Sequence, residues 1–436
     1  MFNRHFDVLD EVTEIFSETV DHDNFPCEDL PRVTEWTQNN IKRFLNDKAL
    51  AVTHINVSAY GASLVAIGAN GHAITPFYNY LKPCPEEIRE MFHRHYVDET
   101  FLADTASPWL GLLNSGIQAY WLKHCKPNEF KAISLFLHLP QYFSFLMTGH
   151  AVSEKTSIGC HTMLWDFPND QYHSWVRKEN LESMFPPIVP VNSRRGYTLH
   201  GQQVTIGAGV HDSSAALMPY LVTRTQPFLM LSTGTWNICF NPWNHDPLTK
   251  EELSKDCLSY MTYEGKPVKA SRIFLGHEHE IQQRELAQYF NIDKDFYKTV
   301  RFDERIYHQT KQDCRGRFHP IGMEGTGPLP EKQLQKTDYT LFTDFPTAQH
   351  QLMIDLVSWQ KLALNLTDPK GHVNDVIVVG GFAKSLMFLE TLKREIPERS
   401  FYVSDHPRAS ALGAAWLVQD PEDLKGSIHL LNINSI

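Results

Sequence analysis

Apolar and polar residues alternate along the first part of the chain in patterns that distinguish strands from helices. A period of two from Phe6 to Val20 predicts a strand, and the spacing from Leu30 to Leu45 predicts a helix. Two short apolar runs, Val52–Val57 and Leu64–Ile67, predict further strands. The Asn-Gly pair in the segment Gly68–Gly71 predicts that the chain reverses after the second run.

The pattern becomes mostly helical between Pro85 and Gly149, and the apolar stretch Leu135–Met147 is included in this prediction. A strand is predicted at Val204–Ile206, directly before a loop of small residues. The first part of the chain is therefore expected to mix short strands with a largely helical insert.

A domain boundary is expected at Leu221–Pro227, a short polar segment closed by proline. It divides the chain into residues 1–222 and 223–436, in line with the two or three folding units expected for a chain of 436 residues. Residues 293–345 are polar and give no usable pattern. The second part is predicted to be another α/β unit, with strands at 228–231, 236–240, 375–381 and 401–403 and helices at 280–290, 349–366, 385–394 and 409–418.

Composition narrows the class of protein. An apolar fraction of 42% and a charged fraction of 21% are ordinary for a globular protein. The net charge of -11 and the lack of a basic block argue against a nucleic-acid partner. Seven dispersed cysteines without a Cys-x-x-Cys pair favour a reducing cytoplasm. Neither a signal peptide nor an apolar stretch of membrane-spanning length is recognisable, so a soluble protein is expected.

The loop Gly207–Ala216 carries one carboxylate, Asp212, among small residues. A carboxylate suits the general base of phosphoryl transfer, because the proton of the attacking hydroxyl moves late in a loose transition state. The alternative is a helix cap or an Asx turn, since Ser213–Leu217 can start a helix. The two roles are compatible.

Two further turns contain groups suited to phosphate. Ser232-Thr233-Gly234-Thr235 follows a short apolar strand and offers backbone N–H groups, hydroxyls and a glycine. Gly380-Gly381-Phe382-Ala383 lies between a buried strand and a helix, an arrangement that can present a helix N-terminus to a nucleotide. An ordinary polar turn and simple strand–helix packing remain open for each, and neither turn has the P-loop or Rossmann spacing.

Gly276-His277-Glu278-His279-Glu280 could suggest metal ligands. Histidines two residues apart lie on opposite sides of a helix, and no third residue has ligand spacing. A solvated helix start is therefore the favoured interpretation, and no metal-ligating residue is assigned.

Three segments in this order resemble the FGGY family of carbohydrate kinases. They are Gly207-AGVHDSSAAL, Leu231-STGTWNI, and Val376-IVVGGFAKS followed by Asp405-HPRASALGAAW. The chain looks most like the rhamnulokinase-type branch, because His211-Asp212, Ser232–Trp236 and Ala59-Tyr60-Gly61 resemble the motifs of that branch.

The resemblance implies two actin-like, ribonuclease H-like ATPase domains around a central cleft, with ATP and Mg²⁺ held mainly by the second domain and the sugar mainly by the first. It places Asp212 on the catalytic base. The positions implied to contact the sugar are Gly61, His211 and Ser213, with Tyr60 and Trp236 as neighbours that could pack on a deoxy sugar. The positions implied to contact the nucleotide are Ser232, Thr233, Gly234, Thr235, Gly380, Gly381 and Ala383.

One feature departs from the family pattern. Family members start with a strand that carries an Asp-x-Gly loop for the ATP phosphates and the metal, and Met1–Val8 does not resemble it. The chain is expected to begin about one hairpin late, which would leave a sheet edge exposed.

The sequence thus predicts ATP-dependent phosphorylation of a ketose, such as L-rhamnulose or a related 6-deoxyketose. A non-catalytic sugar or nucleotide binder with the same fold is the first alternative, and an actin-like ATPase or scaffold is the second. The expected partner is a small sugar, with no nucleic acid and no membrane. The oligomeric state is open, with a homodimer as one option.

Overall fold

The computed structural model describes residues 1–313, 317–323, 325–329, 335–404, 408–420, 424 and 431–436. The chain forms two compact units. The first contains Met1–Thr223, Ser259–Pro267 and Arg408–Leu430, and the second contains Arg224–Leu258, Val268–Pro407 and Leu431–Ile436. Each unit is therefore built from segments that are distant in the sequence, whereas the sequence predicted one cut at residue 222.

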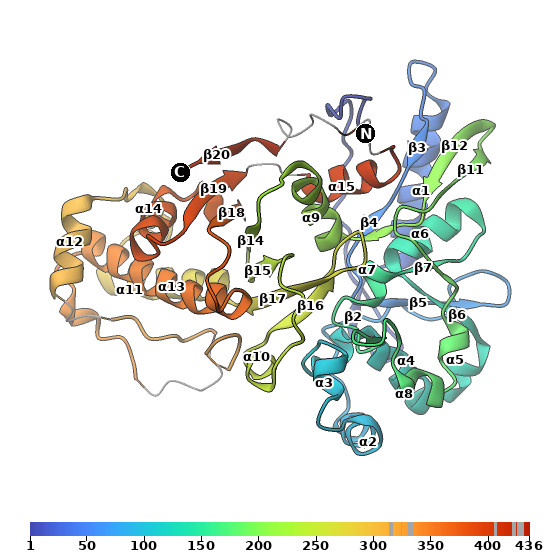
Figure 1. Cartoon of the computed structure of the whole chain (residues 1–436), viewed down its shortest axis with the longest axis horizontal. Coiled ribbons are helices and arrows are strands. Elements are labelled where there is room, and N and C mark those ends of the chain that lie inside the picture. Colours follow the sequence, from blue (N-terminus) through green and yellow to red (C-terminus); the bar gives the residue numbers. More distant parts are fainter. Residues whose placement is uncertain (314–316, 324, 330–334, 405–407, 421–423, 425–430) are drawn as a thin grey trace. The chain divides into compact units, whose positions relative to one another are not determined.

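The first unit combines short strands with helices (Figure 1). Its strands are β1 (Thr19–Val20), β2 (Pro26–Cys27), β3 (His54–Ile55), β4 (Ser58–Ala59), β5 (Leu64–Gly68), β6 (Ile133–His138), β7 (Ser153–Glu154), β8 (Trp165–Asp166), β9 (Gln171–Tyr172), β10 (Ile188–Val189), β11 (Arg194–Leu199), β12 (Gln202–Gly207) and β13 (Val210–His211). Its helices are α1 (Leu30–Asn46), α2 (Glu86–Tyr96), α3 (Phe101–Asp104), α4 (Ser115–Cys125), α5 (Pro127–Ala132), α6 (Leu139–Thr148), α7 (Lys155–Ile158), α8 (Ser174–Lys178), α9 (Asp212–Thr223) and α15 (Ala409–Leu417).

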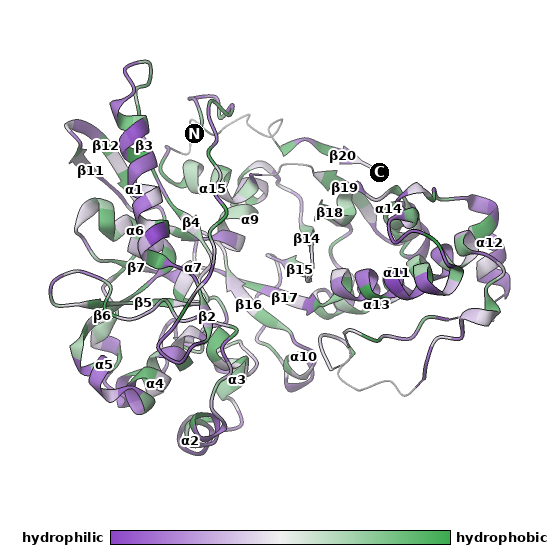
Figure 2. Cartoon of the chain, turned by 180° about the vertical axis from the view of Figure 1, so that it is seen from behind, coloured by the Kyte–Doolittle hydropathy of each residue, from purple (hydrophilic) through white to green (hydrophobic). Residues whose placement is uncertain are grey.

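Helix α1 confirms the predicted helix at Leu30–Leu45. The Asp29 side chain accepts the Arg32 N–H at 3.1 Å and caps the first turn. Hydrophilic and hydrophobic residues alternate along the helix (Figure 2), and its two ends are anchored by buried Leu30 and Leu45.

The predicted strand at Phe6–Val20 is wrong except for its last two residues, which form β1. Phe6 has a φ of 64° and donates its N–H to Asn3, so the chain turns where an extended strand was expected. Ile15 is 90% exposed. An alternation of apolar and polar residues indicates a strand only where one face of that strand is buried, and this segment buries neither face along most of its length.

The hairpin after Leu64–Ile67 is confirmed. Strand β5 ends at Gly68, whose carbonyl accepts the Gly71 N–H, and the chain returns so that Ile67 bridges Ala73. Strand β5 pairs antiparallel with β6. The helix predicted at Leu135–Met147 is therefore wrong for Leu135–His138, which belongs to β6, and confirmed for Leu139–Met147, which belongs to α6. A short apolar run fits a buried strand as well as a helix, and the pairing with β5 decides it. The helix α6 follows, with Pro140 in its first turn.

Helices α9 and α15 lie in backbone contact within the first unit. A methyl group on Gly413 of α15 would be 1.8 Å from the Ala215 carbonyl oxygen of α9. Only glycine permits this approach. The predicted helix at 409–418 is confirmed as α15, whereas the Asp405–Pro407 part of the family motif lies outside the described residues.

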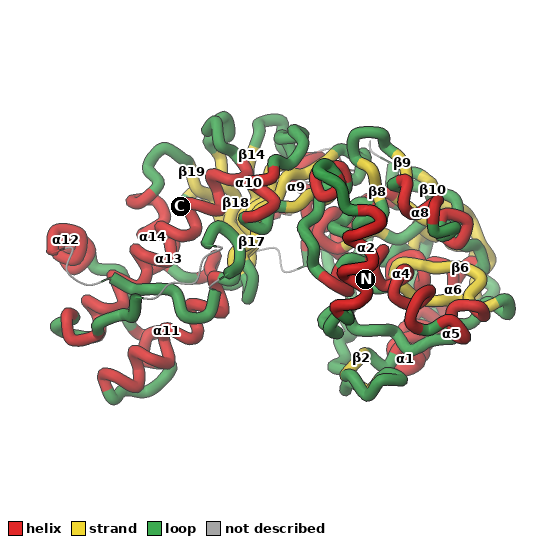
Figure 3. The backbone as a smooth tube through the Cα atoms, turned by 90° about the horizontal axis from the view of Figure 1, so that it is seen from below, coloured by secondary structure: helices red, strands yellow, loops and turns green. Residues whose placement is uncertain are grey.

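The second unit contains a sheet with helices (Figure 3). Six of its strands follow the order β17-β15-β14-β18-β19-β20. They are β14 (Phe228–Thr233), β15 (Asn237–Asn241), β17 (Pro267–Ile273), β18 (Asp375–Gly380), β19 (Ser400–Ser404) and β20 (Ile433–Ser435), and the preceding strand β16 spans Leu258–Met261. The helices are α10 (Lys250–Ser254), α11 (Leu275–Phe290), α12 (Glu304–Asp313), α13 (Phe345–Thr367) and α14 (Leu386–Glu395).

The predicted elements of this unit are confirmed at β14, β15, β18, β19, α11, α13 and α14. Helix α12 was missed, because its sequence in the region 293–345 is polar and only Tyr307 and Thr310 are buried. The core lies between the central strands and α13, with fully buried Leu231, Leu352 and Val376 among its members. In the described part of the chain, no helix has the length and apolarity needed to cross a bilayer.

Candidate functional site

The loop residues of the first unit meet because two of its strands run parallel. Strand β13 pairs with β4, so that His211 lies opposite Ala59. The carboxyl ends of neighbouring parallel strands meet at the same edge of a sheet. Tyr60 and Gly61 leave β4 at this edge, and Asp212 leaves β13 there as the first residue of α9.

The Asp212 carboxylate is fixed through one oxygen. Oδ1 accepts the Ser213 N–H at 2.6 Å and the Ser213 hydroxyl at 3.2 Å, and it lies 3.3 Å from Nε2 of His211. These contacts leave Oδ2 for another proton donor. The side chain is 45% exposed and sits at a helix N-terminus, where the helix dipole favours a negative charge. Asp212 is thus the first residue of α9, and its hydrogen bonds go to the adjacent Ser213, so its role as a base stays a prediction.

His211 is enclosed on several sides. Its backbone N–H donates to the Thr156 hydroxyl at 3.1 Å, and Nε2 lies 3.1 Å from Sγ of Cys160. A methyl group on Gly61 would be 2.9 Å from Cδ2 of the imidazole, so the glycine leaves room for the ring. Burial lowers the pKa of His211, and the nearby Asp212 charge opposes this effect.

Tyr60 belongs to an aromatic group beside this edge. Its hydroxyl donates to Glu28 Oε1 at 2.6 Å, and its ring lies 5.7 Å from that of Tyr80 and 6.1 Å from that of Phe77. Burial, followed by the Glu28 bond, raises the pKa of Tyr60 far above its usual range. Glu28 and Tyr80 were missed from the sequence, because neither belongs to a motif that could have indicated them.

The phosphate-type turns of the second unit also follow parallel strands. Strands β14 and β18 pair so that Thr233 lies opposite Gly380. The Thr233 hydroxyl donates to the Val379 carbonyl at 2.6 Å and accepts the Phe382 N–H at 3.0 Å, and the Thr233 carbonyl accepts the Gly381 N–H at 2.8 Å. The Thr233 side chain is therefore committed to holding the two turns together.

The groups that could reach a ligand are the exposed ones. Gly234, Thr235, Gly380 and Gly381 are exposed, and a methyl group on Gly234 or Gly381 would meet no atom closer than 3.6 Å. Backbone N–H groups in such open turns, with the Thr235 hydroxyl, fit phosphate oxygens. An accompanying Mg²⁺ takes many of its ligands from phosphates and water, so these turns are compatible with ATP and Mg²⁺.

The remaining predicted residues of this unit are buried or half-buried. Ala383 is 8% exposed within the turn Phe382–Lys384, so a ligand would meet its backbone and not its methyl group. Ser232 lies within β14. The Trp236 ring stacks on Phe274 at 4.4 Å, and the Arg272 guanidinium lies 5.0 Å from the Trp236 ring centroid. Trp236 belongs to the second unit, whereas Tyr60, Gly61, His211 and Ser213 belong to the first.

The expected solvated start of α11 is wrong. Glu278 is fully buried and accepts backbone N–H groups from Ile321, Gly322 and Met323 at 2.6 to 3.2 Å. The acid forms a structural anchor for that loop, which the sequence could not show because residues 321–323 carry no pattern. Within the described ranges, no group of His, Cys, Asp or Glu side chains could hold a metal by itself.

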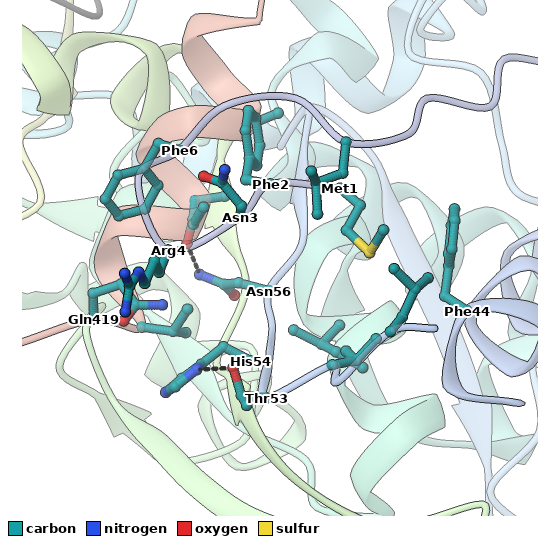
Figure 4. A pocket seen from close by; sticks show the side chains of 18 of the residues that line it. Met1, Phe2, Asn3, Arg4, Phe6, Phe44, Thr53, His54, Asn56 and Gln419 are labelled. Atoms are coloured by element: carbon teal, nitrogen blue, oxygen red, sulfur yellow. Dashed lines mark hydrogen bonds between the residues drawn. The ribbon is translucent and has the colours of Figure 1, made fainter. Parts of the chain in front are cut away.

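A hollow of about 1180 Å³ lies elsewhere in the first unit (Figure 4). Met1–Phe6, α1 and α15 line it together with β3, which is the edge strand of the sheet β11-β12-β3. Asn56 spans the wall by donating its amide to the Ala414 carbonyl at 2.8 Å. Asp212 is not among the lining residues, so this hollow is separate from the carboxylate site.

Comparisons with known proteins relate the chain to sugar kinases. Residues 225–426 match the family described as "Carbohydrate kinase FGGY, C-terminal domain". A rhamnulokinase from Oceanobacillus iheyensis is 23% identical over 254 residues, which cover 55% of this chain and 52% of the relative. The chain thus spans about half the length of the curated relative that it matches.

Two solved structures are similar over nearly the whole chain. A carbohydrate kinase from Novosphingobium aromaticivorans has a TM-score of 0.78 and 24% identity, with 96% of this chain and 90% of that chain covered. A ligand-bound xylulose kinase from Lactobacillus acidophilus has a TM-score of 0.77 and 13% identity, with 100% and 89% covered. The likeness shows that the chain has the two-unit α/β fold of these kinases, which is actin-like and ribonuclease H-like.

Proposed function

Because residues 225–426 belong to the FGGY carbohydrate kinase family, we propose that this chain is an ATP-dependent sugar kinase that phosphorylates a hydroxyl group of a ketose. The observation that carries the proposal is the Asp212 carboxylate, which is fixed through Oδ1 and free at Oδ2. The rhamnulokinase name of the relative supports a 6-deoxyketose such as L-rhamnulose as the substrate.

In the proposed reaction, Oδ2 of Asp212 accepts the proton of the attacking hydroxyl group as its oxygen bonds to the γ-phosphorus of ATP. The bond from that phosphorus to the bridging oxygen breaks, and ADP leaves. Ser213 keeps the carboxylate in one orientation through two hydrogen bonds to Oδ1. This fixed orientation favours transfer, because a base must lie within hydrogen-bond reach of the proton it takes.

The second unit would bind the nucleotide at the turns after β14 and β18. The Thr235 hydroxyl and the exposed backbone beside it would contact the phosphates, whereas the N–H groups of Gly234 and Gly381 already donate to Asn237 Oδ1 and to the Thr233 carbonyl. When bound, Mg²⁺ would neutralise charge that develops on the phosphate oxygens. The Thr233 hydroxyl would act indirectly, by holding the two turns in register.

The test is ADP release by the purified chain in a coupled assay with ATP, Mg²⁺ and a panel of L-rhamnulose, D-xylulose and glycerol. Sugar-dependent release is expected. ADP release that ignores the sugar would support an actin-like ATPase instead. A sugar that raises the melting temperature without turnover would support a non-catalytic binder, and either result would overturn the kinase proposal.

The Asp212→Asn variant tests the proposed base. It should still bind the sugar but lose about 100-fold to 10,000-fold in kcat, as is typical when a general base is removed. Asp170→Asn is a matched control, because Asp170 is an exposed acid of the same unit that pairs with Lys155. Equal turnover of Asp212→Asn and the control would remove Asp212 from this role.

A further inference from the structure

The Asp212 carboxylate contacts the His211 imidazole, which has no role in the proposed reaction as described so far. His211 Nε2 lies 3.1 Å from Cys160 Sγ and 3.3 Å from Asp212 Oδ1. Cys160 is fully buried, His211 is 3% exposed, and the other ring nitrogen, Nδ1, is buried without a hydrogen-bond partner. One imidazole nitrogen therefore faces a carboxylate and a thiol, while the other has no hydrogen-bond partner.

The position of the imidazole proton follows from these contacts. Burial lowers the pKa of His211, so the ring is neutral near pH 7 and carries one N–H. A proton on Nε2 can be donated to both the carboxylate and the sulfur. A proton on Nδ1 would be buried without an acceptor, and the Nε2 lone pair would face the negative carboxylate. The contacts therefore favour the Nε2–H tautomer.

The sulfur is well placed to fix this arrangement. Cys160 follows α7, whose first turn is capped by the buried Glu154 carboxylate through the Thr156 and Ser157 N–H groups at 2.6 and 2.8 Å. Thr156 of the same helix accepts the backbone N–H of His211. Burial raises the pKa of the Cys160 thiol well above its usual range, so the thiol stays neutral. The titratable groups around the His211 ring are Asp212, Cys160, Tyr260 and His138, and Glu154 is the charge nearby on the α7 side.

We propose that Cys160 is a positioning residue whose sulfur accepts the Nε2–H of His211 and keeps the imidazole oriented toward Asp212 Oδ1. The oriented N–H helps to hold Oδ1, so that Oδ2 remains the oxygen that meets the substrate hydroxyl. This inference rests on the proposed function for its effect on catalysis, but the hydrogen bond itself exists without substrate. Cys160 does not contact the reacting atoms in this scheme.

The first experiment needs no substrate. The ¹⁵N spectrum of histidine-labelled protein should show His211 as the Nε2–H tautomer, with its signals assigned by their loss in His211→Gln. Cys160→Ser retains an acceptor and should keep the Nε2 chemical shift. Cys160→Ala leaves Asp212 as the acceptor of the Nε2–H and should change the Nε2 chemical shift without moving the proton to Nδ1. The control is Cys239→Ala, since Cys239 is also a buried thiol, 3.2 Å from the Thr367 hydroxyl in the second unit.

The second experiment measures kcat and KM. Cys160→Ala should lower kcat about 10-fold to 100-fold with KM nearly unchanged, because the imidazole loses the sulfur that orients it toward Oδ1. Cys160→Ser should restore most of kcat, and Cys239→Ala should leave kcat and KM unchanged. A merely structural role for Cys160 would change the melting temperature without a loss of kcat that Cys160→Ser restores.

The outcomes separate the two proposals. A wild-type His211 in the Nδ1–H tautomer overturns the inference, even if Cys160→Ala fails to fold. A folded Cys160→Ala with an unchanged Nε2 chemical shift and an unchanged kcat overturns it as well. If the Nε2 chemical shift changes as expected but wild-type protein phosphorylates no sugar, the hydrogen bond is supported and the kinase proposal fails.

Discussion

A methyl group on Gly380 would lie 2.0 Å from the carbonyl oxygen of Thr233, so these two residues are in a backbone contact that only glycine permits. Gly380 also has a φ of 89°, which disfavours any other residue. The contact joins the end of β14 to the end of β18. The two turns proposed to bind phosphate therefore depend on one glycine for their spacing.

Gly380→Ala is expected to lower the free energy of unfolding by at least about 1–3 kcal/mol, because it adds both strain and a clash. It should also weaken ATP binding about tenfold or more, since both turns must shift. Calorimetric titration with ATP and thermal unfolding measure the two effects. Gly381→Ala is the matched control, because its φ is -64° and its added methyl would be 3.9 Å from the same oxygen. Similar losses in the two variants would contradict this explanation.

Gly61→Ala should disturb the Asp212 site through His211. The added methyl would lie 2.9 Å from the imidazole Cδ2, so the ring must move away from its present contacts. We expect kcat to fall about 10-fold to 100-fold, as small misplacements of catalytic groups do. Gly196→Ala serves as control, because a methyl group there meets no atom within 4 Å. Steady-state kinetics of the two variants give the comparison, and an unchanged kcat in Gly61→Ala would argue against a role for the ring position.

Glu278 should stabilise the second unit by holding the 321–323 loop. Glu278→Ala removes the acceptor of three backbone N–H groups, and a loss of about 3 kcal/mol or more in the free energy of unfolding is expected. Glu278→Gln keeps one acceptor oxygen and should lose less, about 1–2 kcal/mol. The exposed neighbour variant Glu280→Gln should stay within about 0.5 kcal/mol of wild type in urea unfolding. If Glu278→Ala matches that neighbour variant, the anchor role is wrong.

Two buried groups of the second unit are expected to act in opposite directions as pH falls. Burial raises the pKa of Asp355 to about 6. The folded state then holds the proton more tightly than the unfolded chain, so this group adds stability as pH falls from about 6 to about 4. Burial lowers the pKa of His279 to about 4, so its contribution is present above about pH 6.5 and lost toward pH 4.

Substitution of each residue should therefore separate its effect on how the melting temperature depends on pH. Asp355→Asn keeps an acceptor for the Phe318 N–H, which now lies 2.8 Å from the carboxylate, but removes the titration. Its melting temperature should fall more steeply than that of wild type between pH 6.5 and 4. His279→Gln should fall less steeply, and the difference for each group is limited to about 3 kcal/mol by the size of its shift. Parallel curves for all three proteins would show that neither group controls acid stability.

The sequence predicts correctly those elements whose caps, apolar positions and turns all lie within the element itself. The helix at α1 has a cap and an apolar stripe, and the strands at β14 and β18 are apolar runs followed by glycine turns. The strand expected at Phe6–Val20 fails because most of its side chains are exposed. The helix expected at Leu135–Met147 is correct from Leu139 onward and fails only at its start, where a distant strand, β5, pairs with the chain. Tertiary contacts decide such cases, and one sequence does not show them.

In the candidate site, too, residues within local motifs could be predicted, whereas residues brought in from other elements could not. His211, Asp212, Ser213 and Gly61 are brought together as the family motifs imply, since they follow two parallel strands. Cys160 and Glu28 could not be predicted, because each reaches the site from another element through one side-chain contact. The sequence also does not show which glycine of the Gly380-Gly381 pair is indispensable. The structure does, because only a methyl group on Gly380 would clash with the Thr233 carbonyl oxygen.

The contact between Gly413 and Ala215 has a consequence for how the protein is made. Helix α9 leaves the ribosome long before α15, because the segment Val268–Pro407 of the second unit is synthesised in between. The contact between α9 and α15 thus cannot form until α15 has been synthesised. During that interval the face of α9 that packs against α15 is exposed or is covered by other contacts.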